Sequence, residues 1–183
     1  MSAPAAQAAV PPAVPPAAAA GAIDQVVGMA DLKVSASPSD RVITYALGSC
    51  LGIVAYDAAA GVGGMLHVMM PESEIDPRKA EANPYMFVDT GVPQLFRQCY
   101  ALGAKKERIE VRVAGGAYQG EDEAADRFQI GKRNFIALRK LLWKNGVMIK
   151  ASDVGGVQRS RTMALAIGSG DVTVKCNGVA TAL

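Results

Sequence analysis

The first third of the chain alternates short apolar runs with polar or glycine-containing turns, a pattern that predicts β-strands. A mixed segment at 25–34 could form one edge strand, and clearer apolar runs follow at 42–46, 51–56 and 65–70. Because short runs separated by turn residues pair readily with their neighbours in sequence, we expect antiparallel strands here.

Two later segments change to the helical period. Residues 87–102 and 130–144 repeat apolar side chains at intervals of three and four, and a glycine follows each segment within two residues. This spacing places the apolar side chains on one face of a helix, and glycine commonly ends helices. The two segments therefore predict amphipathic helices.

The remaining apolar runs predict further strands around and after these helices. They lie at 109–114, 147–151, 162–167 and 172–176, whereas the polar, proline-containing segment 72–85 is typical of a loop. The total is roughly seven strands and two substantial helices. Because strands follow one another as well as the helices, the order favours an α+β fold with helices on one side of mixed sheets, not a doubly wound parallel sheet.

The N-terminal segment 1–22 has a different composition, since nearly all of its residues are Ala, Pro or Val. Its repeated prolines oppose a membrane helix, and the lack of Lys and Arg opposes a signal peptide. We expect a disordered or polyproline-like tail at 1–22, followed by a single domain at 23–183. No later apolar window is long enough to insert into a membrane.

Charge and cysteine content narrow the possible functions. The formal net charge is +2 and no basic run stands out, so we expect no nucleic-acid partner. Cys50, Cys99 and Cys176 are widely spaced and form no CxxC motif, which argues against a zinc site or a disulfide framework. Reduced thiols in a cytoplasmic protein are the expected state.

The strongest candidate chemistry combines a cysteine with the only histidine. A cysteine nucleophile needs thiolate character, a base, and a group that orients the base. Cys50 follows Gly48 and Ser49, where a sharp turn could leave backbone N–H groups free to bind an oxyanion. His67 is the only imidazole, and Thr44 carries a hydroxyl that could orient it.

The same residues also fit a purely structural interpretation. Cys50 could be a small core residue, His67 a hydrogen-bonded strand residue, and Thr44 an ordinary strand former. The residue types and their spacing alone leave both interpretations open.

Six ordered sequence blocks extend the pattern beyond these residues. They are "TYALGSC", "GGMLHVMMP", "FVDTGVPQL", "VRVAGGA", "IGKRN", and "DVGG" with the downstream "GDVTVK". In these blocks the chain resembles the chemoreceptor glutamine deamidase family, CheD, of bacterial chemotaxis, and the resemblance runs from about residue 26 to 176.

The resemblance implies a fold, an activity and a site. The fold is a three-layer α/β/β sandwich, and the activity converts receptor glutamines to glutamate through a covalent thioester. The implied catalytic set is Cys50, His67 and Thr44, and the reaction needs no metal or organic cofactor. We expect backbone N–H groups of the turn at Gly48, Ser49 and Cys50 to bind the oxyanion. The implied substrate is the set of cytoplasmic helices of chemoreceptors.

Two other functions remain open at this point. In the family the deamidase also pairs with a response-regulator phosphatase of the CheC type, so a chain could keep this binding role with catalysis secondary or lost. Alternatively, the chain could be a cysteine hydrolase that acts on another protein, because fold and catalytic residues do not fix the substrate.

Overall fold

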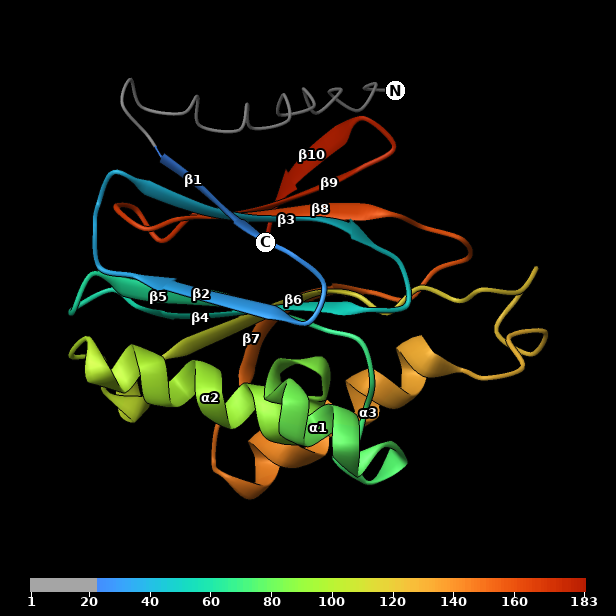
Figure 1. Cartoon of the computed structure of the whole chain (residues 1–183). Coiled ribbons are helices and arrows are strands. Elements are labelled where there is room, and N and C mark those ends of the chain that lie inside the picture. Colours follow the sequence, from blue (N-terminus) through green and yellow to red (C-terminus); the bar gives the residue numbers. More distant parts are fainter. Residues whose placement is uncertain (1–22) are drawn as a thin grey trace, which may run out of the picture.

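A computed structural model describes residues 23–183 as three stacked layers, shown in Figure 1. The outer sheet has the strand order β1 (Ile23–Val27), β3 (Asp40–Leu47), β8 (Arg161–Ala166), β9 (Val172–Cys176) and β10 (Val179–Ala182). The central sheet has the order β2 (Asp31–Ser35), β5 (Val62–Val68), β4 (Leu51–Asp57), β6 (Glu110–Gly115) and β7 (Ile149–Val154).

Helices form the third layer, on the face of the central sheet away from the outer sheet (Figure 1). They are α1 (Pro77–Ala82), α2 (Val88–Ala101) and α3 (Ile130–Lys144), with short 3₁₀ turns at Ser73–Ile75, Pro84–Met86 and Lys106–Arg108. The expected three-layer α/β/β sandwich of mixed sheets with helices on one face is confirmed. No helix within residues 23–183 is long and apolar enough to cross a membrane.

Burial on both faces explains the continuous apolar runs of the central sheet. Every residue of β4 and of β5 is buried. Val54 and Met65 pack between the two sheets, while Ile53 and Leu66 pack under the helices. A sheet covered on both faces needs apolar side chains at successive positions, so these strands do not show polar alternation.

Both long helices lie close to their expected bounds. In α2 the buried side chains include Val92, Leu95 and Phe96, and in α3 they include Leu138 and Leu142. These side chains belong to one apolar cluster with the strands of the central sheet. The antiparallel pairing expected in the first third is confirmed for β5, which pairs antiparallel with β2 and with β4, but β3 pairs parallel with β1.

The segment 25–34 lies at sheet edges, as expected, but it contributes to two strands and not to one. The segment forms the end of β1 and most of β2, which belong to different sheets. Ala30 adopts a left-handed conformation (φ 51°) in the turn between them. Val27 is buried between the sheets and Leu32 beneath the helices, so each half of the segment buries its apolar residue in a different layer.

The expected loop at 72–85 contains the short helix α1, one complete 3₁₀ turn and most of a second one. Asp76 caps α1 by accepting a hydrogen bond from the Lys79 N–H, and Pro77 occupies the first helical position. Capping residues can start a short helix without apolar periodicity, and this segment has no buried residue in α1. The periodicity therefore missed it.

The strand count of roughly seven is too low, and β10 is one reason. β10 pairs antiparallel with β9 through a turn at Asn177 and Gly178, both with positive φ. An Asn-Gly dipeptide is a strong hairpin signal, so the sequence did carry this information. The strand itself is largely exposed, which is why its apolar pattern is weak.

A buried arginine connects the two sheets. The side chain of Arg161, on β8, is fully buried and donates to both carboxylate oxygens of Asp153, at 3.0 and 2.8 Å. It also donates to the carbonyl oxygens of Gly155 and Gly115, at 2.9 and 3.4 Å. Arg161 therefore joins the outer sheet to the end of β6 and β7 in the central sheet.

We expect Asp153→Asn to lower the unfolding free energy by about 3 kcal/mol or more, because it leaves the buried Arg161 cation without its counter-charge. The matched control is Asp24→Asn, which breaks the partly exposed two-bond pair with Arg41 and should cost about 1 kcal/mol or less. Urea denaturation measures both, and equal losses would contradict a special role for the buried pair.

Candidate active site

A hydrogen bond between the two sheets lies at the centre of the candidate site. Thr44, on β3 of the outer sheet, and His67, on β5 of the central sheet, are both buried. The Thr44 hydroxyl oxygen lies 2.8 Å from His67 Nδ1. The structure therefore brings together two of the three residues that the sequence pattern singled out.

The Thr44 hydroxyl also determines which histidine nitrogen carries the proton. It lies 2.8 Å from the carbonyl oxygen of Val27, which can only accept a hydrogen bond. A hydroxyl has one hydrogen to donate, so toward His67 the Thr44 oxygen must accept from Nδ1–H. The lone pair of the neutral imidazole is then on Nε2, which is buried and has no hydrogen-bond partner among the described residues.

Cys50 lies at the same end of the two sheets. In the β4–β5 ladder His67 is opposite Gly52, and Cys50 lies two residues before Gly52, directly before β4 begins. The half-buried Cys50 side chain packs against the apolar cluster between the sheets, the same layer that holds the Thr44–His67 bond.

Asp31 is the other group positioned to orient His67, because it is directly opposite His67 in the β2–β5 ladder. Its carboxylate instead accepts hydrogen bonds from the backbone N–H groups of Gly28 and Leu32, at 3.3 and 2.7 Å. Within residues 23–183, Thr44 is thus the side chain that is hydrogen bonded to the imidazole.

The chain bends at residues 48–50, between β3 and β4, as the sequence suggested, and an irregularity in β3 at Ala46 precedes this bend. Ala46 has a φ of 56°, and the Gly48 N–H donates to the Ala46 carbonyl oxygen at 2.9 Å. Gly48 N–H is therefore already engaged. By contrast, the N–H groups of Ser49 and Cys50 form no hydrogen bond to a protein acceptor within residues 23–183.

The carbonyl groups of this turn are held by a neighbouring segment. Ala117 N–H donates to the Gly48 carbonyl and Gly116 N–H to the Cys50 carbonyl, each at 2.8 Å. A side chain at Gly115 would place its Cβ 2.1 Å from the Cys50 carbonyl oxygen. Glycine at 115 therefore permits the close backbone approach that holds Cys50.

Burial keeps both titratable groups neutral near pH 7. It lowers the pKa of His67 to about 4, and it raises the pKa of the Cys50 thiol, which its own backbone N–H only partly opposes. Burial therefore does not favour the thiolate that a cysteine nucleophile needs. Desolvation disfavours the charged form of each group, so the pair begins as thiol and imidazole.

Asn134 is the last residue of the block "IGKRN", but sequence reasoning assigned it no role. This residue is fully buried on α3, and its side-chain N–H₂ donates to the carbonyl oxygens of Ser49 and Met69, at 3.2 and 3.0 Å. Asn134 lies four residues before the buried Leu138. A polar residue on the buried stripe of a helix was the signal that could have found it.

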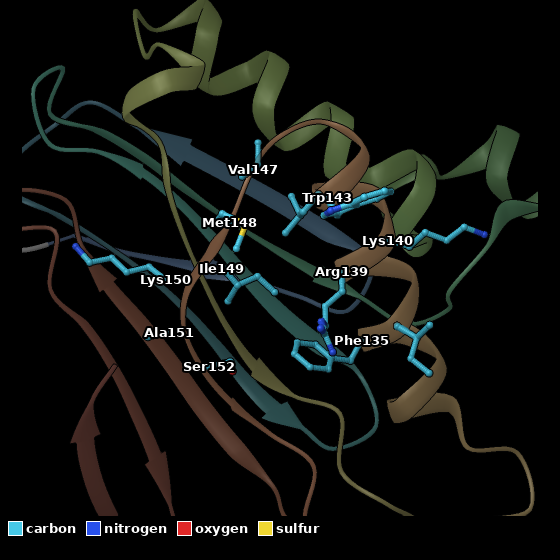
Figure 2. Close-up of a pocket in the computed structure, with 12 residues that line it drawn as sticks. Phe135, Arg139, Lys140, Trp143, Val147, Met148, Ile149, Lys150, Ala151 and Ser152 are labelled. Atoms are coloured by element: carbon cyan, nitrogen blue, oxygen red, sulfur yellow. The ribbon is translucent and has the colours of Figure 1, made fainter.

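A separate groove lies between α3 and β7 (Figure 2). Phe135, Arg139 and Trp143 of α3 line one side and Met148 and Ile149 the other. None of the three candidate catalytic residues lines it. Within residues 23–183, no group of three or more His, Cys, Asp and Glu side chains is arranged to hold a metal ion.

The lowered pKa of His67 predicts a specific loss of stability in acid. Between about pH 6.5 and pH 4 the unfolded chain binds a proton at His67 while the folded protein does not, so lowering the pH favours unfolding. We expect the unfolding free energy to fall by about 3 kcal/mol across this window from His67 alone.

Urea denaturation of the native protein and of His67→Gln, each at neutral and at mildly acidic pH, isolates this contribution. Glutamine does not titrate, so the variant should lose correspondingly less stability on acidification. An identical pH dependence in the two proteins would contradict a neutral buried His67.

Comparisons with known proteins identify the family of this chain. The family model described as "CheD chemotactic sensory transduction" matches residues 69–176, a region that begins two residues after His67. A protein of Solibacter usitatus named probable chemoreceptor glutamine deamidase CheD is 48% identical over 153 residues, which cover 84% of this chain and 89% of the relative.

Two further relatives have the same kind of name. The probable chemoreceptor glutamine deamidase CheD 1 of Syntrophus aciditrophicus is 45% identical, over 85% of this chain and 95% of its own. The CheD 2 of Anaeromyxobacter dehalogenans is 44% identical, over 81% of this chain and 92% of its own. A family model that matches more than half of the chain, with relatives aligned over most of their length, shows that this chain belongs to the CheD family.

Proposed function

We propose that this protein is a protein-glutamine deamidase that converts glutamines of chemotaxis receptors to glutamate. The names of its relatives support the reaction and the substrate class. The observation that carries the proposal for this chain is the hydrogen bond from His67 Nδ1–H to Thr44, since it leaves the Nε2 lone pair free to act as a base. The strand that begins directly after Cys50 pairs with the strand of His67.

The reaction begins from the neutral pair. As the substrate carboxamide enters, His67 Nε2 takes the proton of the Cys50 thiol, and Sγ attacks the carboxamide carbon. The C–N bond of the tetrahedral intermediate then breaks, and the imidazolium gives its proton to the leaving nitrogen, which departs as ammonia. Water then attacks the resulting thioester with His67 as base. The receptor is released with a glutamate side chain, and the Cys50 thiol is restored.

Backbone N–H groups of the Cys50 turn are suited to the oxyanion. The N–H groups of Ser49 and Cys50 lack protein acceptors among the described residues, whereas that of Gly48 is used within the turn. Fixed N–H donors stabilise the charge that develops on the carbonyl oxygen at no cost of reorganisation. We therefore assign the oxyanion site to Ser49 and Cys50.

This mechanism requires no cofactor and no metal ion, because every proton and electron pair moves between cysteine, histidine, substrate and water. The substrate would be the cytoplasmic helices of the receptors, so we place the protein in the cytoplasm. A CheC-type phosphatase as a second partner stays a prediction of the family resemblance.

The central test is incubation of a purified receptor cytoplasmic domain with the protein, followed by intact-mass and peptide-mass analysis. Each deamidation replaces NH₂ by OH and releases one ammonia, and Cys50→Ala should abolish both signals because no thioester can form. The matched control is Cys99→Ala, since Cys99 is buried on α2 and burial raises the pKa of its thiol to about 12.

Ammonia release by Cys50→Ala at the native rate would rule out the covalent route. If the native protein leaves the receptor mass unchanged while a known relative deamidates it, the substrate assignment is wrong.

The role of Thr44 predicts the rank of two substitutions. Thr44→Ser keeps the oxygen that accepts from His67 Nδ1–H, whereas Thr44→Val keeps the shape and leaves both Nδ1–H and the Val27 carbonyl without a partner. General-base catalysis contributes about 10²–10⁴-fold, so we expect Val to lower kcat by at least about tenfold and Ser to recover much of that loss.

Steady-state kinetics of receptor deamidation, with melting temperatures measured in parallel, gives this ranking. Higher kcat for Val than for Ser would exclude Thr44 as the orienting group.

A further inference from the structure

Asn134 occupies a position where an apolar residue would be expected. It lies on the buried stripe of α3, and its side-chain carbonyl oxygen is buried with no hydrogen-bond partner among the described residues. An unpartnered buried oxygen is unfavourable, and an apolar residue of similar shape would avoid this cost. The two hydrogen bonds that the Asn134 amide nitrogen donates must therefore contribute more than the cost of the unpartnered oxygen.

The two acceptors of Asn134 flank the candidate site. Ser49 directly precedes Cys50, and Met69 follows His67 by two residues. The β4–β5 ladder ends with Leu51 opposite Val68, so these carbonyls lie just past its last pair. Because both acceptors are carbonyl oxygens, the amide nitrogen must face them, and one side chain joins the two strands where their ladder ends.

The bond to Ser49 fixes the direction of the Cys50 N–H. In a trans peptide the C=O of one residue and the N–H of the next point in opposite directions. Holding the Ser49 carbonyl toward α3 therefore directs the Cys50 N–H away from α3. With the bonds from Ala117 to Gly48 and from Gly116 to Cys50, three successive carbonyls of the turn are held.

Close packing of α3 allows this contact. A Cβ on Gly131, at the start of α3, would lie 2.4 Å from the carbonyl oxygen of Gly116. Because residue 131 is glycine, the first turn of α3 can pack directly against the backbone of Gly116, whose N–H donates to the Cys50 carbonyl. One turn later, Asn134 reaches Ser49 from the same direction.

We propose that Asn134 is a positioning residue of the deamidase site: by holding the Ser49 and Met69 carbonyls it directs the Cys50 N–H toward the thiol and the developing oxyanion. This inference rests on the proposed function for its catalytic consequence. Its structural consequence, an N–H that stabilises the Cys50 thiolate, holds for any chemistry of this cysteine.

The test compares Asn134→Leu with the native protein. Leucine keeps the shape of the side chain and removes both donors. Asn145→Leu is the matched control, because Asn145 follows the same helix and its exposed side chain donates only to Leu141. Asn134→Ser, which keeps one O–H donor in a smaller side chain, serves if the leucine variant does not fold.

The first measurement is the pH dependence of Cys50 alkylation by iodoacetamide, resolved by peptide mass mapping. Loss of the directed N–H should raise the midpoint of the profile, because the thiolate loses a donor. Simple loosening of the turn would instead expose the thiol and lower its midpoint toward that of an ordinary cysteine. An unchanged or lowered midpoint in the folded variant would overturn the proposal.

The second measurement separates kcat from KM for receptor deamidation. We expect kcat to fall at least about tenfold with little change in KM, since small misplacements of reacting groups are costly. A lowered melting temperature with native kcat and native alkylation would assign Asn134 a structural role only. If the native protein deamidates no receptor, the proposed function fails, but the alkylation midpoints still decide the role of Asn134.

Discussion

The hydrogen bond between Thr44 and His67 requires both sheets to be in place. Its two residues lie 23 positions apart on strands of different sheets, and the bond exists only when the sheets stack in register. The carbonyl of Val27, on a third strand, then fixes the direction of the Thr44 hydroxyl. A single proton position on His67 thus depends on the alignment of β1, β3 and β5.

The apolar surroundings of this bond set the resting chemistry. His67 and Thr44 lie among side chains such as Met65 and Met163 that exclude water, so the imidazole is a neutral base and the Cys50 thiol stays protonated. The charged pair has little solvation to stabilise it before substrate binds. We therefore expect Cys50 to become reactive only when substrate is bound. The sulfur then bonds to the carboxamide carbon as the thiol proton moves to His67.

Backbone contacts hold Cys50 in place. Gly115 allows the Cys50 carbonyl to approach closely, Gly116 donates to it, and Asn134 holds the preceding carbonyl. Arg161 donates to the Gly115 carbonyl on the other side of the same segment and joins it to the outer sheet. The segment that positions Cys50 is therefore bound by both sheets and by α3.

Much of the local structure was determined by the sequence itself. The period of apolar residues located α2 and α3, the continuous apolar runs located β4 and β5, and the order of motifs indicated the family and the residues Thr44, Cys50 and His67. These signals are local, because helix and strand periods reflect which side of an element is buried. The Asn-Gly turn before β10 was equally local, although the weak pattern of that exposed strand concealed it.

The tertiary structure decided everything that depends on partners distant in sequence. Periodicity shows that a side chain is buried but not in which layer, so it could not divide 25–34 between two sheets. It could not show that Gly48 N–H is used within its own turn, that burial raises the pKa of Cys50, or that Asn134 holds the Ser49 carbonyl. Hydrogen-bond directions and desolvation arise from the packed environment as a whole, and that environment exists only once the layers have assembled.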